Sequence, residues 1–262
     1  MIREGTTLGE RMSSASARAL GAEEHLQIAL LFRKARQHVV DRDAAEAVRR
    51  SLNDHTWSVE SNLDLLPKPD GPVWFEWPLP TRSGRGGGDI ARTGCLVCPE
   101  PNGANYAVVV TAWEAEGPPE HSYGIAVIDF DELPIRATAA RRFYSKDPHE
   151  SIERIMAGIG VFVPTGFADE IKILVGADGD PKAATEAAMR DATSEIPFLL
   201  ALMLSLNVSG GLETREEGGI YRIVLPPARR RPGLAGVIDG FAKSRVGSFL
   251  RTHHDRAAWI RA

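Results

Sequence analysis

The chain has 262 residues, of which 43% are hydrophobic and 25% are charged, and its formal net charge is −4. These proportions are those of a globular protein, and they exclude a collagen, a coiled coil and a disulfide-rich miniprotein. The length predicts one or two domains, and a chain of this size can bury a core without a metal or disulfide bonds.

The N-terminal part of the chain is predicted to be helical. Residues 1–21 are mostly small and polar, and we expect a frayed terminus there. From Ala22 to Val40 apolar residues recur at helical spacing, and a second helix is expected over Asp43–Leu52. The prolines and glycine that follow indicate a linker over Asn53–Asp70.

The middle of the chain changes to the composition of β-strands. Strands are expected over Pro72–Pro78, Arg92–Pro99, Tyr106–Trp113, Tyr123–Phe130 and Ile135–Tyr144. Turn-forming residues separate these runs, so the pattern predicts an antiparallel meander and not a series of βαβ crossovers.

Helices are predicted to dominate the second half. Asp147 followed by Pro148 indicates a helix start, and a strand is expected over Ile171–Val175. A long helix is predicted over Lys182–Leu206, with a kink or break at Pro197. Beyond it, Glu217-Gly218-Gly219 lies between two short apolar runs and predicts a hairpin.

Together these elements predict an α+β fold. We expect a central antiparallel sheet, running from about Val73 to Tyr144, packed against the Lys182–Leu206 helix and the N-terminal helices. The chain is divided into an N-terminal helical segment (1–60), an α+β core domain (61–225) and a basic C-terminal segment (226–262).

The order of several motifs resembles a known family. Trp74-Phe75-Glu76-Trp77-Pro78 precedes Arg92-Thr93-Gly94-Cys95-Leu96-Val97, and the apolar run 198–204 is followed by a hairpin and Arg229 to Arg231. This order is similar to uncharacterised proteins carried by phages and prophages of proteobacteria, over roughly Pro72 to Arg231. Pro232 and the glycine-rich residues after it depart from the family pattern. The resemblance implies a phage-related origin and transfers no functional residue.

The two cysteines form a C-x-x-C pair, which is found in zinc sites and in redox centres. Cys95 and Cys98 lie in a strand-like run, where side chains three residues apart point to opposite faces. We therefore expect two buried, unbridged thiols, and neither a metal nor a cofactor.

Carboxylates at the end of a strong strand suggest one enzymatic hypothesis. Asp129, Asp131 and Glu132 follow the strand that ends near Phe130, and Glu114 and Glu116 follow the preceding strand. Metal-dependent nucleases place carboxylates at such positions, where two metal ions hold the reacting phosphate. Acidic residues are also common in turns, so a purely structural role is the alternative.

The basic C-terminal segment is the stronger functional lead. It carries eight Lys and Arg against Asp239 and Asp255, a net charge of about +6. The candidate anion-binding residues are Arg229, Arg230, Arg231, Lys243, Arg245 and Arg251. The segment can bind nucleic acid, bind a protein partner, or fold back on the acidic remainder of the chain. Arg82 and Arg85, in a glycine-rich loop, are a further candidate anion contact.

These features favour a non-enzymatic binding or assembly protein over the alternative, a metal-dependent enzyme acting on nucleic acid. The N-terminus lacks an apolar stretch of signal-peptide length. The longest apolar run, residues 198–206, is too short to span a membrane. We therefore expect a cytoplasmic protein without a membrane partner.

Overall fold

The computed structural model describes residues 7–15, 23–60, 62–79, 92–100, 102, 105–114, 119–140, 155–176, 179–207 and 211–227. Its helices are α1 (Leu8–Ala15), α2 (Glu23–Lys34), α3 (Arg42–Glu60), the 3-10 turn η1 (Leu63–Leu65), α4 (Glu132–Ala140), α6 (Thr165–Val175), α7 (Pro181–Thr193) and α8 (Ile196–Asn207). Its strands are β1 (Arg36–Val40), β2 (Val73–Pro78), β3 (Arg92–Pro99), β4 (Tyr106–Glu114), β5 (Glu120–His121), β6 (Ile125–Asp129), β7 (Ile159–Phe162), β8 (Glu213–Glu217) and β9 (Ile220–Val224).

Within the described ranges the strands form one nine-stranded sheet, in the order β7-β6-β4-β3-β2-β1-β9-β8, with β5 paired to β4. The fold is α+β, but the sheet is mixed and not antiparallel throughout. β1 runs parallel to both β2 and β9, and the other pairs are antiparallel. The connection from β1 through α3 to β2 is therefore a βαβ crossover, which the sequence pattern did not predict.

The prediction that residues 1–60 form a helical segment is wrong in part, because they include the strand β1. The helix expected to reach Val40 ends at Lys34, and Arg36–Val40 forms a strand between β2 and β9. Val39 and Val40 fit a helical spacing in the sequence, but as β-branched residues they also suit a strand. The N-terminal part of the chain therefore contributes to the middle of the sheet.

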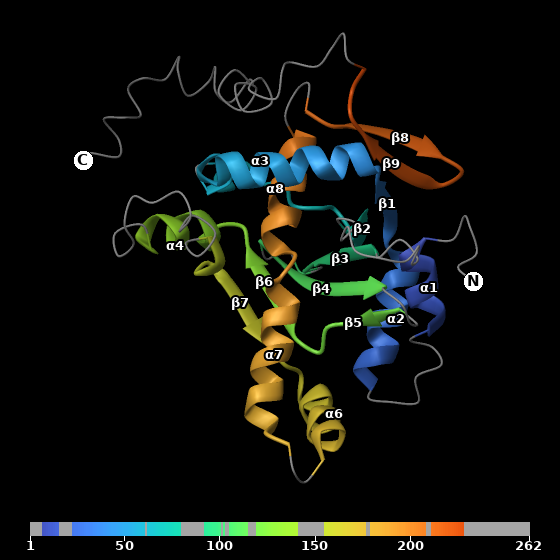
Figure 1. Cartoon of the computed structure of the whole chain (residues 1–262), viewed down its shortest axis with the longest axis vertical. Helices are drawn as coiled ribbons and strands as arrows, with labels where there is room; N and C mark the ends of the chain where they lie inside the picture. Colours follow the sequence, from blue (N-terminus) through green and yellow to red (C-terminus); the bar gives the residue numbers. More distant parts are fainter. Residues whose placement is uncertain are drawn as a thin grey trace, which may run out of the picture.

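Two apolar layers cover the two faces of the sheet (Figure 1). On one face the core includes Trp74 and Leu96 together with side chains from α1, α2 and α6. On the other face α8 and α3 pack over residues such as Phe75 and Cys95. Every residue of α8 from Ile196 to Ser205 is buried, as expected for the all-apolar run.

The long helix expected over Lys182–Leu206 is two helices. α7 ends at Thr193 and α8 begins at Ile196, so the break falls just before Pro197, as predicted. The side chain of Asp180 caps α7 by accepting a hydrogen bond from the Lys182 N–H.

Two expected strands are helices. Residues 132–140 form α4, and residues 165–175 form α6, in place of strands over Ile135–Tyr144 and Ile171–Val175. In α6 the buried residues are Phe167 and Ile171, whose spacing of four residues is helical. The helix start expected at Asp147 lies outside the described residues.

The predicted hairpin and the predicted burial of the two unbridged cysteines are confirmed. Gly218 and Gly219 connect β8 and β9 with φ values of 62° and 84°, the left-handed region that a two-residue turn of this kind requires. Cys95 and Cys98 are buried and unbridged, and they belong to the cores on opposite faces of the sheet. None of the described helices combines the length and the apolar character that crossing a membrane would require.

Candidate functional site

The carboxylates of the enzymatic hypothesis lie at the start of α4. Asp129 accepts hydrogen bonds from the backbone N–H groups of Asp131 and Glu132, at 3.0 and 2.9 Å. Asp131 accepts a hydrogen bond from Asn105, and Glu132 pairs with Arg136 one helical turn away. These three acidic side chains therefore have local structural partners.

The structure separates this group from the carboxylate that was expected to join it. Asp129 is opposite Tyr106, at the beginning of β4, whereas Glu114 lies at the other end of that strand. Among the residues that the structure describes, no group of three His, Cys, Asp or Glu side chains is placed to hold a metal ion. Glu116 lies outside the described residues.

All six candidate anion-binding residues, Arg229, Arg230, Arg231, Lys243, Arg245 and Arg251, also lie outside the described residues. The structure does show where the chain leads into them. β9 ends at Val224, and the described chain ends at Pro227, two residues before Arg229.

The strand directions bring several chain segments to this end of the sheet. β1, β2 and β9 run parallel, so Val40, Pro78 and Val224 lie at the same end. β3 begins there with Arg92, which is opposite Pro78 in β2 and opposite Glu114 in β4. The loop that contains Arg82 and Arg85 therefore leaves and re-enters the described structure at the end of the sheet where β9 leads into the basic C-terminal segment.

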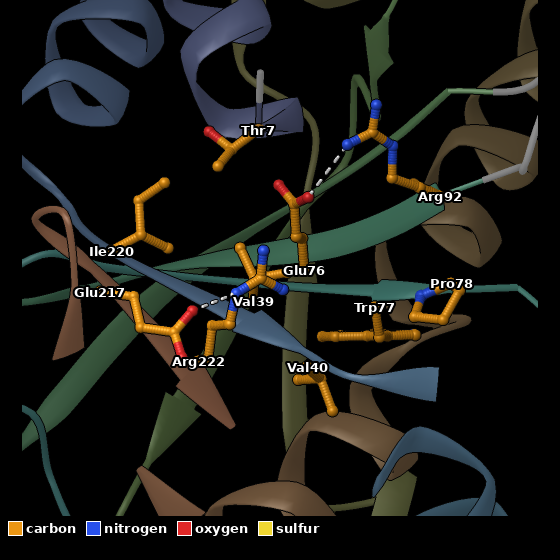
Figure 2. Close-up of a pocket in the computed structure, with 10 residues that line it drawn as sticks. All are labelled: Thr7, Val39, Val40, Glu76, Trp77, Pro78, Arg92, Glu217, Ile220 and Arg222. Carbon is orange, nitrogen blue, oxygen red and sulfur yellow. Dashed lines mark hydrogen bonds and ion pairs between the residues drawn. The ribbon is translucent and has the colours of Figure 1, made fainter. Parts of the chain in front are cut away.

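A cavity of about 290 Å³ extends along β1 from this end of the sheet to Ile220, the first residue of β9 (Figure 2). It is lined by Thr7, Val39, Val40, Glu76, Trp77, Pro78, Arg92, Glu217, Ile220 and Arg222. Val39 is the cross-strand neighbour of both Glu76 and Arg222, so these three side chains lie in one row on one face of the sheet. The cavity therefore combines an apolar floor with charged groups of both signs.

Glu76 is held by the start of α1. Its Oε2 atom accepts a hydrogen bond from the Leu8 N–H at 2.7 Å, another from the Gly9 N–H, and a third from the Trp74 indole N–H at 3.0 Å. Its side chain is almost completely buried, and the other oxygen faces Arg92 at 3.4 Å. A carboxylate at this position satisfies backbone donors that a helix N-terminus leaves unpaired, and it interacts favourably with the helix dipole.

The first turn of α1 has a second cap within the helix itself. Thr7 accepts a hydrogen bond from the Glu10 N–H, and the Glu10 carboxylate accepts one from the Thr7 N–H. This reciprocal pair is a capping box. Because Thr7 also lines the cavity, the cap and Glu76 together fix one wall of the site.

Close packing fixes the Trp74 indole, which orients Glu76. A Cβ atom on Gly94 of β3 would lie 2.5 Å from the indole ring, and one on Gly9 of α1 would lie 2.7 Å from it. Phe32 of α2 meets the same ring edge-on, with 5.0 Å between the ring centroids. Glycine at position 94 therefore leaves room for the indole within the sheet, and glycine at position 9 lets α1 approach it.

Arg92 connects the cavity to a second buried carboxylate. It lies 3.5 Å from Glu114, which also forms an ion pair with Arg11 of α1. Glu76 and Glu114 are each about 1% exposed, and two arginines compensate their charges. Removing one partner of such a network leaves a buried charge without compensation, which is strongly destabilising.

The opposite wall of the cavity is formed by the hairpin. Arg222 of β9 pairs with Glu217 of β8 at 2.9 Å and with Asp41, which follows β1, at 3.3 Å. Figure 2 shows these two ion-paired groups, Arg222 with Glu217 and Arg92 with Glu76, on the two sides of Val39. The carboxylates that line the cavity are thus paired with arginines of the same folded body.

A further acidic group lies on the other face of the sheet at this end. Burial raises the pKa of Glu195, although a hydrogen bond from the Trp77 indole and the charge of Arg49 both act in the opposite direction. Arg49 donates to the carbonyl of Pro78 and lies 5.3 Å from the centre of the Phe198 ring. Arginine side chains therefore contribute to both faces of the sheet where β2 ends.

Sequence reasoning did not identify Glu76, Arg92 or Glu114 as parts of one site. The available signal was Glu76 itself, because a single carboxylate within the apolar strand Val73–Pro78 needs a buried partner. Arg11 and Glu114 carry no such signal, since they are far apart in the chain and meet only after folding.

Comparisons with protein-family models, with curated proteins and with solved structures found no match to this chain.

Proposed function

We propose that this chain is a non-enzymatic binding or assembly protein of phage or prophage origin. In this proposal the basic C-terminal segment binds the phosphate backbone of a nucleic acid at the end of the sheet where β9 terminates. The enzymatic alternative has no comparable support, since Asp129, Asp131 and Glu132 each have a local structural partner.

The main support is the pairing of the charges at the cavity. Glu76, Glu114 and Glu217 already have arginine partners within the folded body. Because these carboxylates are already neutralised, they attract the C-terminal arginines only weakly. A partner outside the chain is therefore favoured over folding back on this surface. This is the single observation on which the proposal depends.

The position of the glycine-rich loop adds to this support. The loop joins Pro78 to Arg92, and both residues line the cavity. Arg82 and Arg85 thus belong to a segment that starts and ends at the same end of the sheet as Pro227. Two basic stretches, distant in sequence, are thus anchored at the same end of the sheet.

The proposed chemistry is neutralisation of phosphates and not reading of bases. Lys and Arg that contact phosphates release condensed counterions, which makes the affinity depend steeply on salt. Contacts of this kind position a protein on nucleic acid without selecting a sequence. We therefore expect binding that is independent of sequence.

The test is fluorescence anisotropy with a labelled 20-base-pair DNA duplex as the probe, at several salt concentrations. Four to six phosphate contacts predict a slope of about −4 to −5 for log K against log salt. Replacing Arg229, Arg230 and Arg231 together by alanine should weaken binding and reduce the steepness of the slope by up to about 2.7.

Arg136→Ala is the matched control, because Arg136 is an exposed arginine on α4 whose partner is Glu132 on the same helix. It should leave both the affinity and the slope unchanged. If micromolar protein fails to shift the anisotropy at about 50 mM salt, nucleic-acid binding is rejected, since non-specific binding is detectable under these conditions. An interaction with a protein partner would then be the hypothesis to pursue.

A further inference from the structure

Two histidines and a glutamate form a chain of hydrogen bonds away from the cavity. His25 of α2 lies with its Nδ1 atom 2.8 Å from Nε2 of His121 in β5. The Nε2 atom of His25 lies 2.9 Å from the Glu170 carboxylate on α6. His121 completes the chain, with its Nδ1 atom 2.9 Å from the backbone carbonyl oxygen of Ser122.

The groups at the two ends of this series of hydrogen bonds determine how many protons the two imidazoles must carry. The Ser122 carbonyl oxygen can only accept, so Nδ1 of His121 must donate to it. In a neutral His121 the Nε2 atom is then an acceptor, and Nδ1 of His25 must donate to it. An ionised Glu170 also only accepts, so Nε2 of His25 must donate as well. Three hydrogen bonds thus require three protons, one more than two neutral imidazoles supply.

We propose that this junction is a pH-dependent latch, in which His25 is an imidazolium and its additional proton holds α6 against α2 and β5. When that proton is lost, a lone pair of His25 faces either the Glu170 carboxylate or the Nε2 lone pair of His121. One hydrogen bond is then replaced by a repulsive contact, and α6 is held less firmly.

The surroundings support placing the charge on His25 and not on His121. Burial lowers the pKa of the His121 imidazole, and this outweighs the hydrogen bond to Ser122. His25 is in contact with the ionisable carboxylate of Glu170, and its side chain is 12% exposed. A second proton, on His121, would put two donors face to face, so the latch also weakens when the pH falls below the lowered pKa of His121.

The other ionisable groups near the junction, among the residues that the structure describes, do not supply the proton. Glu24 of α2 accepts a hydrogen bond from the Gly166 N–H at the start of α6. Asp169 and Lys172 of α6 pair with each other. Burial raises the pKa of Tyr123, and the charges of Glu170 and Glu120 raise it further, so this phenol stays neutral in the range in which imidazoles titrate.

The apolar contacts around the latch show which part of the fold depends on it. The His25 ring lies 4.8 Å from the Phe167 ring of α6, and Tyr123 meets Phe167 edge-on at 5.3 Å. Phe167 is fully buried and belongs to the core that α1 and α2 cover. Opening the latch therefore loosens the docking of α6 first.

The direct test is nitrogen NMR of the imidazole rings in the full chain at about pH 7.5. We expect two protonated nitrogens on His25 and a proton on Nδ1 alone of His121. A neutral His25 under these conditions would overturn the proposal, and this measurement needs no variant protein.

A second test uses Glu170→Gln, because a glutamine can donate its amide proton to Nε2 of a neutral His25. All three hydrogen bonds then form without the additional proton. In the wild type, hydrogen exchange should show the opening equilibrium of α6 rising up to about tenfold per pH unit above pH 7, after correction for intrinsic exchange. In Glu170→Gln this rise should be absent.

His38→Gln is the matched control, since His38 packs between Phe75 and Tyr221, away from α6. This variant should keep the pH dependence of the wild type. If Glu170→Gln also keeps it, or if the wild type shows none, the latch does not exist.

Discussion

Leu200→Ala tests the central position of α8 in the core. Leu200 is 0% exposed, and α8 packs against α3 in the apolar core that both helices share with the sheet, so the surroundings have little freedom to close around a missing side chain. The substitution removes three carbon atoms, and their transfer to water costs about 2.4 kcal/mol. The cavity left behind adds to this, so we expect a loss of about 3–4 kcal/mol in the free energy of unfolding.

Urea unfolding followed by circular dichroism measures this loss. With an m value of about 3 kcal/mol/M, the midpoint should fall by about 1 M while m itself stays constant. Leu206→Ala is the control, because Leu206 lies on the same helix but is only partly buried. Its effect should be clearly smaller. Equal shifts for the two variants would refute the assignment of α8 as the central core helix.

Three further predictions follow from individual contacts. Glu76→Ala should cost about 3–5 kcal/mol and speed hydrogen exchange in α1, because it removes the acceptor of the Leu8 and Gly9 N–H groups and one of the two buried carboxylates that face Arg92; an unchanged exchange rate in α1 would contradict this. Burial raises the pKa of Cys98 to about 12 and that of Cys95 even further. Neither thiol should therefore react with a disulfide reagent at pH 8 until urea is added, and rapid labelling of the native protein would show the burial to be wrong. Gly219→Ala should lower stability by about 1 kcal/mol in thermal unfolding, because its φ of 84° is unfavourable for alanine; an unchanged melting temperature would argue against this turn.

Much of the sheet could be predicted from local patterns. The strands β2, β4 and β6 are rich in β-branched and aromatic residues, and the turn at Gly218 and Gly219 has a clear signature. The break before α8 follows from Pro197 alone. These features depend on neighbours in sequence, which a sequence pattern records directly.

β1 and α6 were missed for a different reason. β1 is only five residues long, and it is a strand because β2 and β9 pair with it on both sides. α6 has the composition of a strand over Ile171–Val175, but Phe167 and Ile171, four residues apart, are both buried on one helical face, and Phe167 belongs to the core on the α2 side of the sheet. In both cases tertiary contacts override the local preference.

The candidate site depends on contacts that are distant in sequence. The ion pair of Arg11 with Glu114, and the contact of His25 with His121, each join residues about a hundred positions apart. Nothing in the local sequence indicates such a pairing. Glu76 is the exception, since a carboxylate in an apolar strand predicts that a buried partner exists, although not which residue it is.

We propose that the C-terminal segment acts on a partner and is not part of the folded body. The most direct test is a chain that ends at Pro227, where the described structure ends after β9. We predict that this chain keeps the urea midpoint of the full-length protein and loses binding to the DNA duplex in the anisotropy assay. A lower midpoint would show that residues 228–262 stabilise the body, and unchanged binding would show that the partner is held elsewhere. Either result would contradict this proposal.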